Sequence, residues 1–191
     1  MSGRASLNPA LVVTAARIAL IPVVMVLILV DDTGGRYWAF ALYVVAAVTD
    51  SIDGWLARSR GEVTVAGTFL DPLADKLLVI GALLCLIEVG DVAAWIVMVI
   101  IARELAVTGL RLVAISENLV IPASNVGKAK TLSQNIAVAW VILNLGAAWV
   151  DAALLYVAVV LTVLSGAYYF IMARRRLFVG RAPAPDAAGD P

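Results

Sequence analysis

Long apolar stretches separated by short polar segments dominate the chain. An apolar stretch of roughly 18 or more residues with few charges is typical of a helix that crosses a membrane. No stretch alternates apolar and polar residues with a period of two, so the pattern indicates helices rather than strands. We predict an all-α integral membrane protein with six transmembrane helices, at Pro9–Val30, Tyr37–Arg58, Gly67–Val89, Val92–Ser116, Gly127–Val150 and Ala152–Arg174.

The two ends of the chain differ from this pattern. The first apolar stretch is interpreted as a retained span rather than a signal peptide, because it leads into Asp31 and Asp32 without a small-x-small cleavage pattern. The segment "RAPAPDAAGDP" is rich in proline and alanine. We expect residues 1–180 to form one membrane domain and residues 181–191 to form a disordered cytoplasmic tail.

The short loops differ in charge on the two sides of the predicted bundle. One side carries a single basic residue, Arg36, beside several carboxylates. By the positive-inside rule, the more basic side faces the cytoplasm, so both termini are expected there. Tyr168 and Tyr169 are expected in the aromatic belt at that interface. The nine basic residues of the cytoplasmic side are Arg4, Arg58, Arg60, Lys128, Lys130, Arg174, Arg175, Arg176 and Arg181.

Composition narrows the possible chemistry. The chain is 63% hydrophobic and only 15% charged, whereas a soluble domain is about 25% charged. The formal net charge is zero, so charge gives no indication of nucleic-acid binding, and no nucleic-acid partner is expected. Histidine is absent and Cys85 is the single cysteine, which excludes an internal disulfide, a Cys/His zinc site and a His-based triad within one chain. Any metal must therefore be held by oxygen, which suits Mg²⁺, Ca²⁺ or Mn²⁺.

Four aspartates lie within one short part of this apolar chain. Asp50 and Asp53 share a face near the end of the second predicted helix, and Asp71 and Asp75 share a face near the start of the third. The short link between these helices makes them antiparallel neighbours, so the four carboxylates can meet. Such a cluster would repel itself without cations, which indicates Mg²⁺ or Mn²⁺. The alternative is a cation or proton transporter, although the cluster lies at one face and no internal repeat is visible.

The same stretch carries a recognisable motif. Asp50-Ser-Ile-Asp53-Gly54-Trp-Leu-Ala57-Arg58, followed after eight residues by Gly67-x-x-x-Asp71-x-x-x-Asp75, resembles the complete signature of the CDP-alcohol phosphotransferases. That family transfers a phosphatidyl-type group from a CDP-linked donor to an alcohol and releases CMP. The resemblance implies six spans with cytoplasmic termini, a homodimer, and two divalent cations held by Asp50, Asp53, Asp71 and Asp75.

The resemblance also implies further roles for these residues. Asp75 would deprotonate the acceptor alcohol while sharing in metal binding. The CDP donor would be bound by Asp50, Gly54, Ala57, Arg58 and Gly67, together with Thr14 and Arg17 of the first helix. An equal alternative for Arg17 is that it does not contact the donor and only extends its charged end to the membrane interface.

The acceptor is indicated by other segments. "NPALVVTAARIALIP", "ARELAVTGLRLVA" and "GKAKTLSQ" resemble helices of bacterial phosphatidylglycerophosphate synthases. The resemblance therefore implies transfer of a phosphatidyl group from CDP-diacylglycerol to sn-glycerol 3-phosphate, with release of CMP, at the cytoplasmic face of the cell membrane. The alternative acceptors are inositol phosphate, serine and phosphatidylglycerol, the last of which would give cardiolipin.

An acceptor that carries a phosphate needs a basic pocket. Arg103 and Arg111 are eight residues apart, about 80° around one helix and roughly 12 Å along it. Lys128, Lys130 and Thr131 begin the next helix, whose first N–H groups favour an anion. These five residues are predicted to bind the acceptor phosphate, with Glu104 orienting a neighbouring cation. The alternatives are membrane anchoring for the lysines, and pairing with Glu104 or lipid head groups for the arginines.

Overall fold

A computed structural model describes residues 9–30, 32–60, 65–117 and 124–175, and it describes side chains for residues 14–30, 32–49, 73–117 and 124–175. All of the described regular structure is α-helical, which confirms the predicted all-α class. The predicted disordered tail at residues 181–191 lies outside the described residues. The six helices are α1 (Pro9–Val30), α2 (Thr33–Arg60), α3 (Val65–Glu88), α4 (Ala94–Ser116), α5 (Asn125–Leu143) and α6 (Ala148–Arg174).

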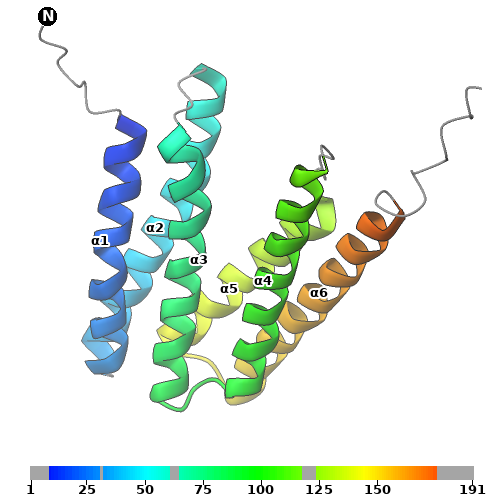
Figure 1. The fold of residues 1–191 in the computed structure, drawn as a ribbon. Helices are drawn as coiled ribbons and strands as arrows, with labels where there is room; N and C mark the ends of the chain where they lie inside the picture. Colours follow the sequence, from blue (N-terminus) through cyan, green and yellow to red (C-terminus); the bar gives the residue numbers. More distant parts are fainter. Residues whose placement is uncertain (1–8, 31, 61–64, 118–123, 176–191) are drawn as a thin grey trace, which may run out of the picture.

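The helices alternate in direction along the bundle (Figure 1). The start of α1, the end of α2, the start of α3, the end of α4, the start of α5 and the end of α6 therefore lie at one end of the molecule, which we call the site end. Helix α1 packs against α2 and α3, and α6 packs against α4 and α5. Contacts of α5 with α2 and α3 join these two groups. Every segment with predicted chemistry thus begins or ends at the same side of the bundle.

The boundary between α5 and α6 differs from the sequence prediction. The apolar stretch was expected to remain helical to Val150, but α5 ends at Leu143. Asn144 adopts the left-handed conformation, with φ 47° and ψ 39°, and its N–H donates to the carbonyl of Val141 at 3.2 Å. Asparagine tolerates that conformation, so it ends the helix although the surrounding residues are apolar.

Gly146 completes this turn. A Cβ atom at Gly146 would lie 2.7 Å from the indole nitrogen of Trp140 and 3.0 Å from a carboxylate oxygen of Asp151. The close approach of the last turn of α5 to the first turn of α6 therefore requires a glycine. The predicted fifth span is consequently shorter than expected, and the sixth helix begins earlier than its predicted start at Ala152.

The described bundle has a buried apolar core, and many of its large apolar side chains also lie on its surface. Large apolar residues such as Leu105 and Trp149 are 69% and 75% exposed. Within the described helices, α6 is the one that is both long and apolar enough by composition to cross a membrane, while the apolar part of α1, Thr14–Val30, is shorter. Among the described side chains, seven polar or charged residues are also buried: Thr14, Arg17, Arg36, Lys130, Gln134, Thr162 and Ser165.

An ion pair connects α2 to the turn between α3 and α4 at the end of the bundle opposite the site end. Arg36 Nη1, near the start of α2, lies 2.7 Å from Asp91 Oδ2 in the turn between α3 and α4. The Arg36 side chain is only 6% exposed. A buried arginine whose carboxylate partner is removed is strongly destabilising, so this pair fixes the register of α2 against that turn.

Candidate active site

A cavity of about 450 Å³ opens at the site end, between α3, α4, α5 and α6. Four of the five residues predicted to bind the acceptor phosphate line it, and so does the predicted catalytic residue Asp75. The structure therefore brings together predicted residues that are up to 56 positions apart in the chain, namely Asp75 and Thr131. The lining residues are Asp75, Lys76, Arg103, Glu104, Arg111, Ser124, Gly127, Lys128, Thr131, Leu132, Asn135 and Tyr169.

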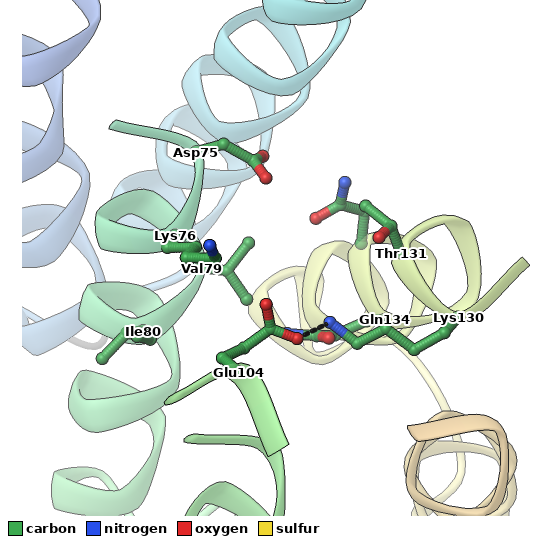
Figure 2. A pocket seen from close by; sticks show the side chains of 9 residues that line it. Asp75, Lys76, Val79, Ile80, Glu104, Lys130, Thr131 and Gln134 are labelled. Carbon is green, nitrogen blue, oxygen red and sulfur yellow. Dashed lines mark hydrogen bonds and ion pairs between the residues drawn. The ribbon is translucent and has the colours of Figure 1, made fainter. Parts of the chain in front are cut away.

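Asp75 projects from α3 into this space. Its carboxylate points toward the side of α5 that carries Thr131 (Figure 2). The residue is half-buried. Among the described side chains, none donates a hydrogen bond or forms an ion pair with it; the nearby Lys76 instead donates from Nζ to Thr108 Oγ1 at 3.2 Å. The Asp75 carboxylate is thus held at the cavity wall with its oxygens available to a ligand.

The other three predicted metal ligands lie on the expected segments. Asp50 and Asp53 are in the last part of α2, and Asp71 is in the first part of α3. Their side chains, like those of the predicted donor-binding residues Gly54, Ala57, Arg58 and Gly67, lie outside the described residues. The described side chains contain no group of three potential metal ligands. Four carboxylates on two antiparallel helix ends remain a chemically suitable donor set for Mg²⁺ or Mn²⁺.

Glu104 is the centre of an ionic network inside the cavity wall. Its Oε1 atom accepts hydrogen bonds from Arg103 Nη1 at 3.0 Å and from Lys130 Nζ. The side chains of Lys130 and Glu104 are 5% and 13% exposed. Lys130 was predicted to bind the acceptor phosphate, but in the structure its ammonium group is paired with Glu104. It lines a smaller cavity and is absent from the lining of the 450 Å³ cavity.

That smaller cavity has a volume of about 30 Å³ and lies deeper between α3, α4 and α5 (Figure 2). Its polar wall is formed in part by Asp75, Glu104 and Gln134. The Oε1 atom of Gln134 is buried and has no hydrogen-bond partner in the described part of the protein. Because one water needs roughly this space and at least two polar partners, the small cavity suits a single bridging water.

A tyrosine that the sequence pattern assigned to the membrane interface lies inside the site instead. Tyr169 on α6 is 1% exposed, whereas its neighbour Tyr168 is 42% exposed. Arg111 Nη2 donates to the Tyr169 hydroxyl at 2.8 Å. The expected belt position is therefore wrong for Tyr169. Its contact with Arg111 was not visible in the sequence, because 58 residues separate the two.

The start of α5 is oriented toward the same cavity. Ser124 caps the helix, its Oγ accepting the N–H of Gly127 at 3.1 Å. Lys128 and Thr131 follow on the first turns and line the cavity. The positive end of the α5 dipole and the Lys128 ammonium group together favour an anion here.

Thr14 and Arg17 of α1 are 2% and 4% exposed. Neither lines the 450 Å³ cavity. The structure thus places these two predicted donor-binding residues inside the bundle rather than at its surface. Arg17 is buried, which does not fit a side chain that only extends to the interface.

Known proteins with similar sequences belong to the family whose motif this chain carries. The family model for CDP-alcohol phosphatidyltransferase matches residues 7–164. The chain is 44% identical over 176 residues to the CDP-diacylglycerol–glycerol-3-phosphate 3-phosphatidyltransferase of Bacillus subtilis (strain 168), covering 83% of this chain and 91% of that protein. It is 38% identical over 181 residues to a probable phosphatidylglycerophosphate synthase of Mycobacterium tuberculosis (strain ATCC 25618 / H37Rv), covering 92% and 86% of the two chains. A third similar protein, from Shigella flexneri serotype 5b (strain 8401), has the same name as the Bacillus protein and is 36% identical over 171 residues, covering 86% and 93%.

Proposed function

The chain belongs to the CDP-alcohol phosphatidyltransferase family, and from this membership we propose that it transfers a phosphatidyl group from CDP-diacylglycerol to sn-glycerol 3-phosphate. The products are phosphatidylglycerophosphate and CMP, so the enzyme acts in phospholipid biosynthesis. One structural observation carries the choice of acceptor: Asp75 shares a single cavity with Arg111 and Lys128. A carboxylate and fixed cations around one space match an acceptor that has both a hydroxyl group and a phosphate.

In the proposed reaction, the free hydroxyl oxygen of glycerol 3-phosphate attacks the phosphorus that bears the diacylglycerol group. The new P–O bond forms as the bond to CMP breaks, and CMP leaves with the electron pair. Asp75 accepts the hydroxyl proton. A carboxylate is a weak base toward an alcohol, so it must act on a hydroxyl held within hydrogen-bond reach. Arg103, Arg111, Lys128 and Thr131 supply this positioning by binding the phosphate of the acceptor. Lys130 lies beside them with its ammonium group paired to Glu104.

The metal ligands are proposed to be Asp50, Asp53, Asp71 and Asp75. Two Mg²⁺ or Mn²⁺ ions bound there would neutralise charge on the diphosphate during the displacement. The Asp75 carboxylate supports this assignment, because it makes no hydrogen bond or ion pair with the described residues and lies at the wall of the cavity. A carboxylate committed to an arginine or lysine would be a poorer ligand.

The donor is proposed to lie against the end of α2 and the start of α3. Gly54, Ala57 and Gly67 would allow the cytidine diphosphate to approach the helix backbones, and Arg58 and Asp50 would bind it at the rim. Thr14 and Arg17 would contact the donor from α1. Their burial supports a role inside the bundle rather than at its surface.

We further propose that all six helices span the membrane, with the site end in the cytoplasm, and that the protein is a homodimer in the cell membrane. The exposed apolar surface and the buried polar residues support an apolar solvent around the bundle. Intramembrane charges lower the average apolar character of α2 to α5, and such charges are tolerated where they face a polar cavity. The basic loops at the site end support its cytoplasmic orientation.

An acceptor panel tests the proposed function. Purified protein, CDP-diacylglycerol and Mg²⁺ are incubated with glycerol 3-phosphate, inositol phosphate, serine or phosphatidylglycerol, and CMP release is measured. We expect release with glycerol 3-phosphate. Release with another acceptor alone would retain the family reaction and reject the proposed acceptor. Cation uptake into liposomes without any CMP release would instead favour a transporter.

A further inference from the structure

Tyr169 contacts both arginines of the proposed acceptor site. The Cζ atom of Arg111 is 5.0 Å from the centre of its ring, and that of Arg103 is 5.6 Å from it. A guanidinium group within about 6 Å of a ring centre is attracted to the negative face of the ring. The tyrosine ring is almost completely buried, so it provides a fixed surface for two long, otherwise flexible side chains.

The hydroxyl group of Tyr169 adds a second constraint. Its oxygen accepts hydrogen bonds from Arg111 Nη2 at 2.8 Å and from the backbone N–H of Ser124 at 3.0 Å. Arg111 is on α4 and Ser124 immediately precedes α5, so one oxygen atom on α6 links three helices. This oxygen thereby sets the distance between the Arg111 guanidinium group and the first turn of α5.

Gly127 permits this arrangement. A Cβ atom at Gly127 would lie 3.3 Å from the Tyr169 oxygen and 3.5 Å from a carbon of its ring. The absence of a side chain at this position lets the first turn of α5 pack directly on the phenol. Lys128 follows in the same turn and lines the cavity.

Arg103 is constrained from its other side. Its Nη1 atom donates to Glu104 Oε1 at 3.0 Å and its Nη2 atom donates to Ser165 Oγ, which is on α6. Both arginines are therefore held before any ligand arrives. Binding an anion with preorganised side chains loses less conformational entropy than binding it with free ones.

We propose that Tyr169 is a positioning residue that fixes Arg103, Arg111 and the first turn of α5 into one anion site and thereby gives the enzyme its preference for an acceptor that carries a phosphate. This inference rests on the proposed function for the identity of that acceptor. Tyr169 acts through the arginines and through Ser124, and the proposal assigns it no contact with the reacting atoms.

Steady-state kinetics of three variants test the proposal. Tyr169→Phe removes the hydroxyl group and keeps the ring, Tyr169→Leu removes both, and Tyr168→Phe is the matched control on the exposed neighbour. We expect Tyr169→Phe to raise the KM for glycerol 3-phosphate about tenfold, the effect typical of losing one hydrogen bond to a charged group. The KM for CDP-diacylglycerol should not change. Tyr169→Leu should raise the glycerol 3-phosphate KM further, and Tyr168→Phe should leave both constants unchanged.

A second measurement separates this proposal from the proposed function. Inorganic phosphate should raise the melting temperature of the detergent-solubilised wild-type protein, and glycerol 3-phosphate should compete with it for the site. The phosphate-induced shift should be reduced in Tyr169→Phe and retained in Tyr168→Phe. If the wild type uses a different acceptor but this pattern holds, the anion site stands and the proposed function fails.

The opposite outcomes overturn the inference. If the wild type turns over glycerol 3-phosphate while both Tyr169 variants keep its KM and the phosphate-induced shift, Tyr169 has no positioning role. If Tyr169→Phe raises the KM values of donor and acceptor equally, the tyrosine supports the bundle as a whole. Should Tyr169→Leu fail to fold, Tyr169→Phe decides the question, because its ring fills the same volume.

Discussion

Lys130 on α5 forms an ion pair with Glu104 on α4, and both side chains are largely removed from solvent. Both residues line the small cavity of about 30 Å³ together with Asp75 (Figure 2). A buried ion is costly unless its partner remains, so each member makes the other tolerable in the bundle. The ammonium group of Lys130 is therefore held beside the proposed acceptor site with Glu104 as its ion-pair partner.

Breaking this pair is expected to destabilise the protein. Removal of one partner of a buried ion pair costs about 3–5 kcal/mol, so Glu104→Ala and Lys130→Met should each lower the melting temperature in detergent. The double variant should be less destabilised than the sum of the two single variants, because no uncompensated charge remains. Additive losses would show that the two side chains do not interact.

Asp75→Asn is expected to remove most of the activity. The amide keeps the shape of the side chain but cannot accept the acceptor proton, and loss of general-base catalysis typically reduces a rate about 10²–10⁴-fold. CMP release measures the loss. Glu88→Gln, an exposed site at the other end of the same helix, is the control and should remain fully active. A variant with Asn at position 75 that keeps wild-type kcat would exclude Asp75 as the base.

Removal of divalent cations is expected to abolish CMP release. Chelation with EDTA should stop turnover, and Mg²⁺ or Mn²⁺ should restore it, since the histidine-free chain offers oxygen ligands that suit these ions. Asp71→Asn should raise the Mg²⁺ concentration needed for half-maximal activity. Turnover that continues undiminished in excess chelator would contradict the four-aspartate metal site.

Charge removal at the cavity is expected to affect the acceptor more than the donor. Lys128→Ala and Arg111→Ala should each raise the KM for glycerol 3-phosphate by about tenfold, because a hydrogen-bonded ion pair with the acceptor phosphate is lost. Arg174→Ala, an exposed change at the end of α6, should leave that KM unchanged. Equal increases in the KM values of both substrates would argue against a phosphate pocket.

Two glycines are expected to respond oppositely to substitution by alanine. Gly146→Ala places a methyl group 2.7 Å from the Trp140 nitrogen, and such overpacking typically costs about 1–3 kcal/mol. Gly109→Ala in α4 has no atom within 4 Å and should stabilise the helix by up to about 1 kcal/mol. Thermal unfolding in detergent distinguishes the two. Equal stability of both variants would mean that the turn before α6 can relax around a side chain.

Much of the helical architecture could be predicted from apolar patterning. The first predicted span coincides with α1, and the others overlap α2 to α6. The exception is informative: α5 ends at Leu143, where Asn144 adopts a left-handed conformation. The apolar pattern continues through this point and gave no indication of the turn. The turn-forming residues Asn144 and Gly146 are present there, but the prediction followed the apolar pattern instead.

The residues of the candidate site were predictable to different degrees. Arg111, Lys128 and Thr131 were selected from the sequence, and they line one cavity with Asp75. The position of Tyr169 was not predictable, because aromatic residues near a helix end usually face the interface. Its burial depends on how α6 is rotated against α4 and α5, which a single helix does not specify.

The sequence by itself determined which segments are helical, where acidic residues gather and which family motif they form, because these properties depend on residues close together in the chain. Only the tertiary structure decided that Lys130 faces Glu104 and that Tyr169 contacts both Arg103 and Arg111. Those contacts join different helices, and they arise when packing fixes the rotation and spacing of each helix against its neighbours.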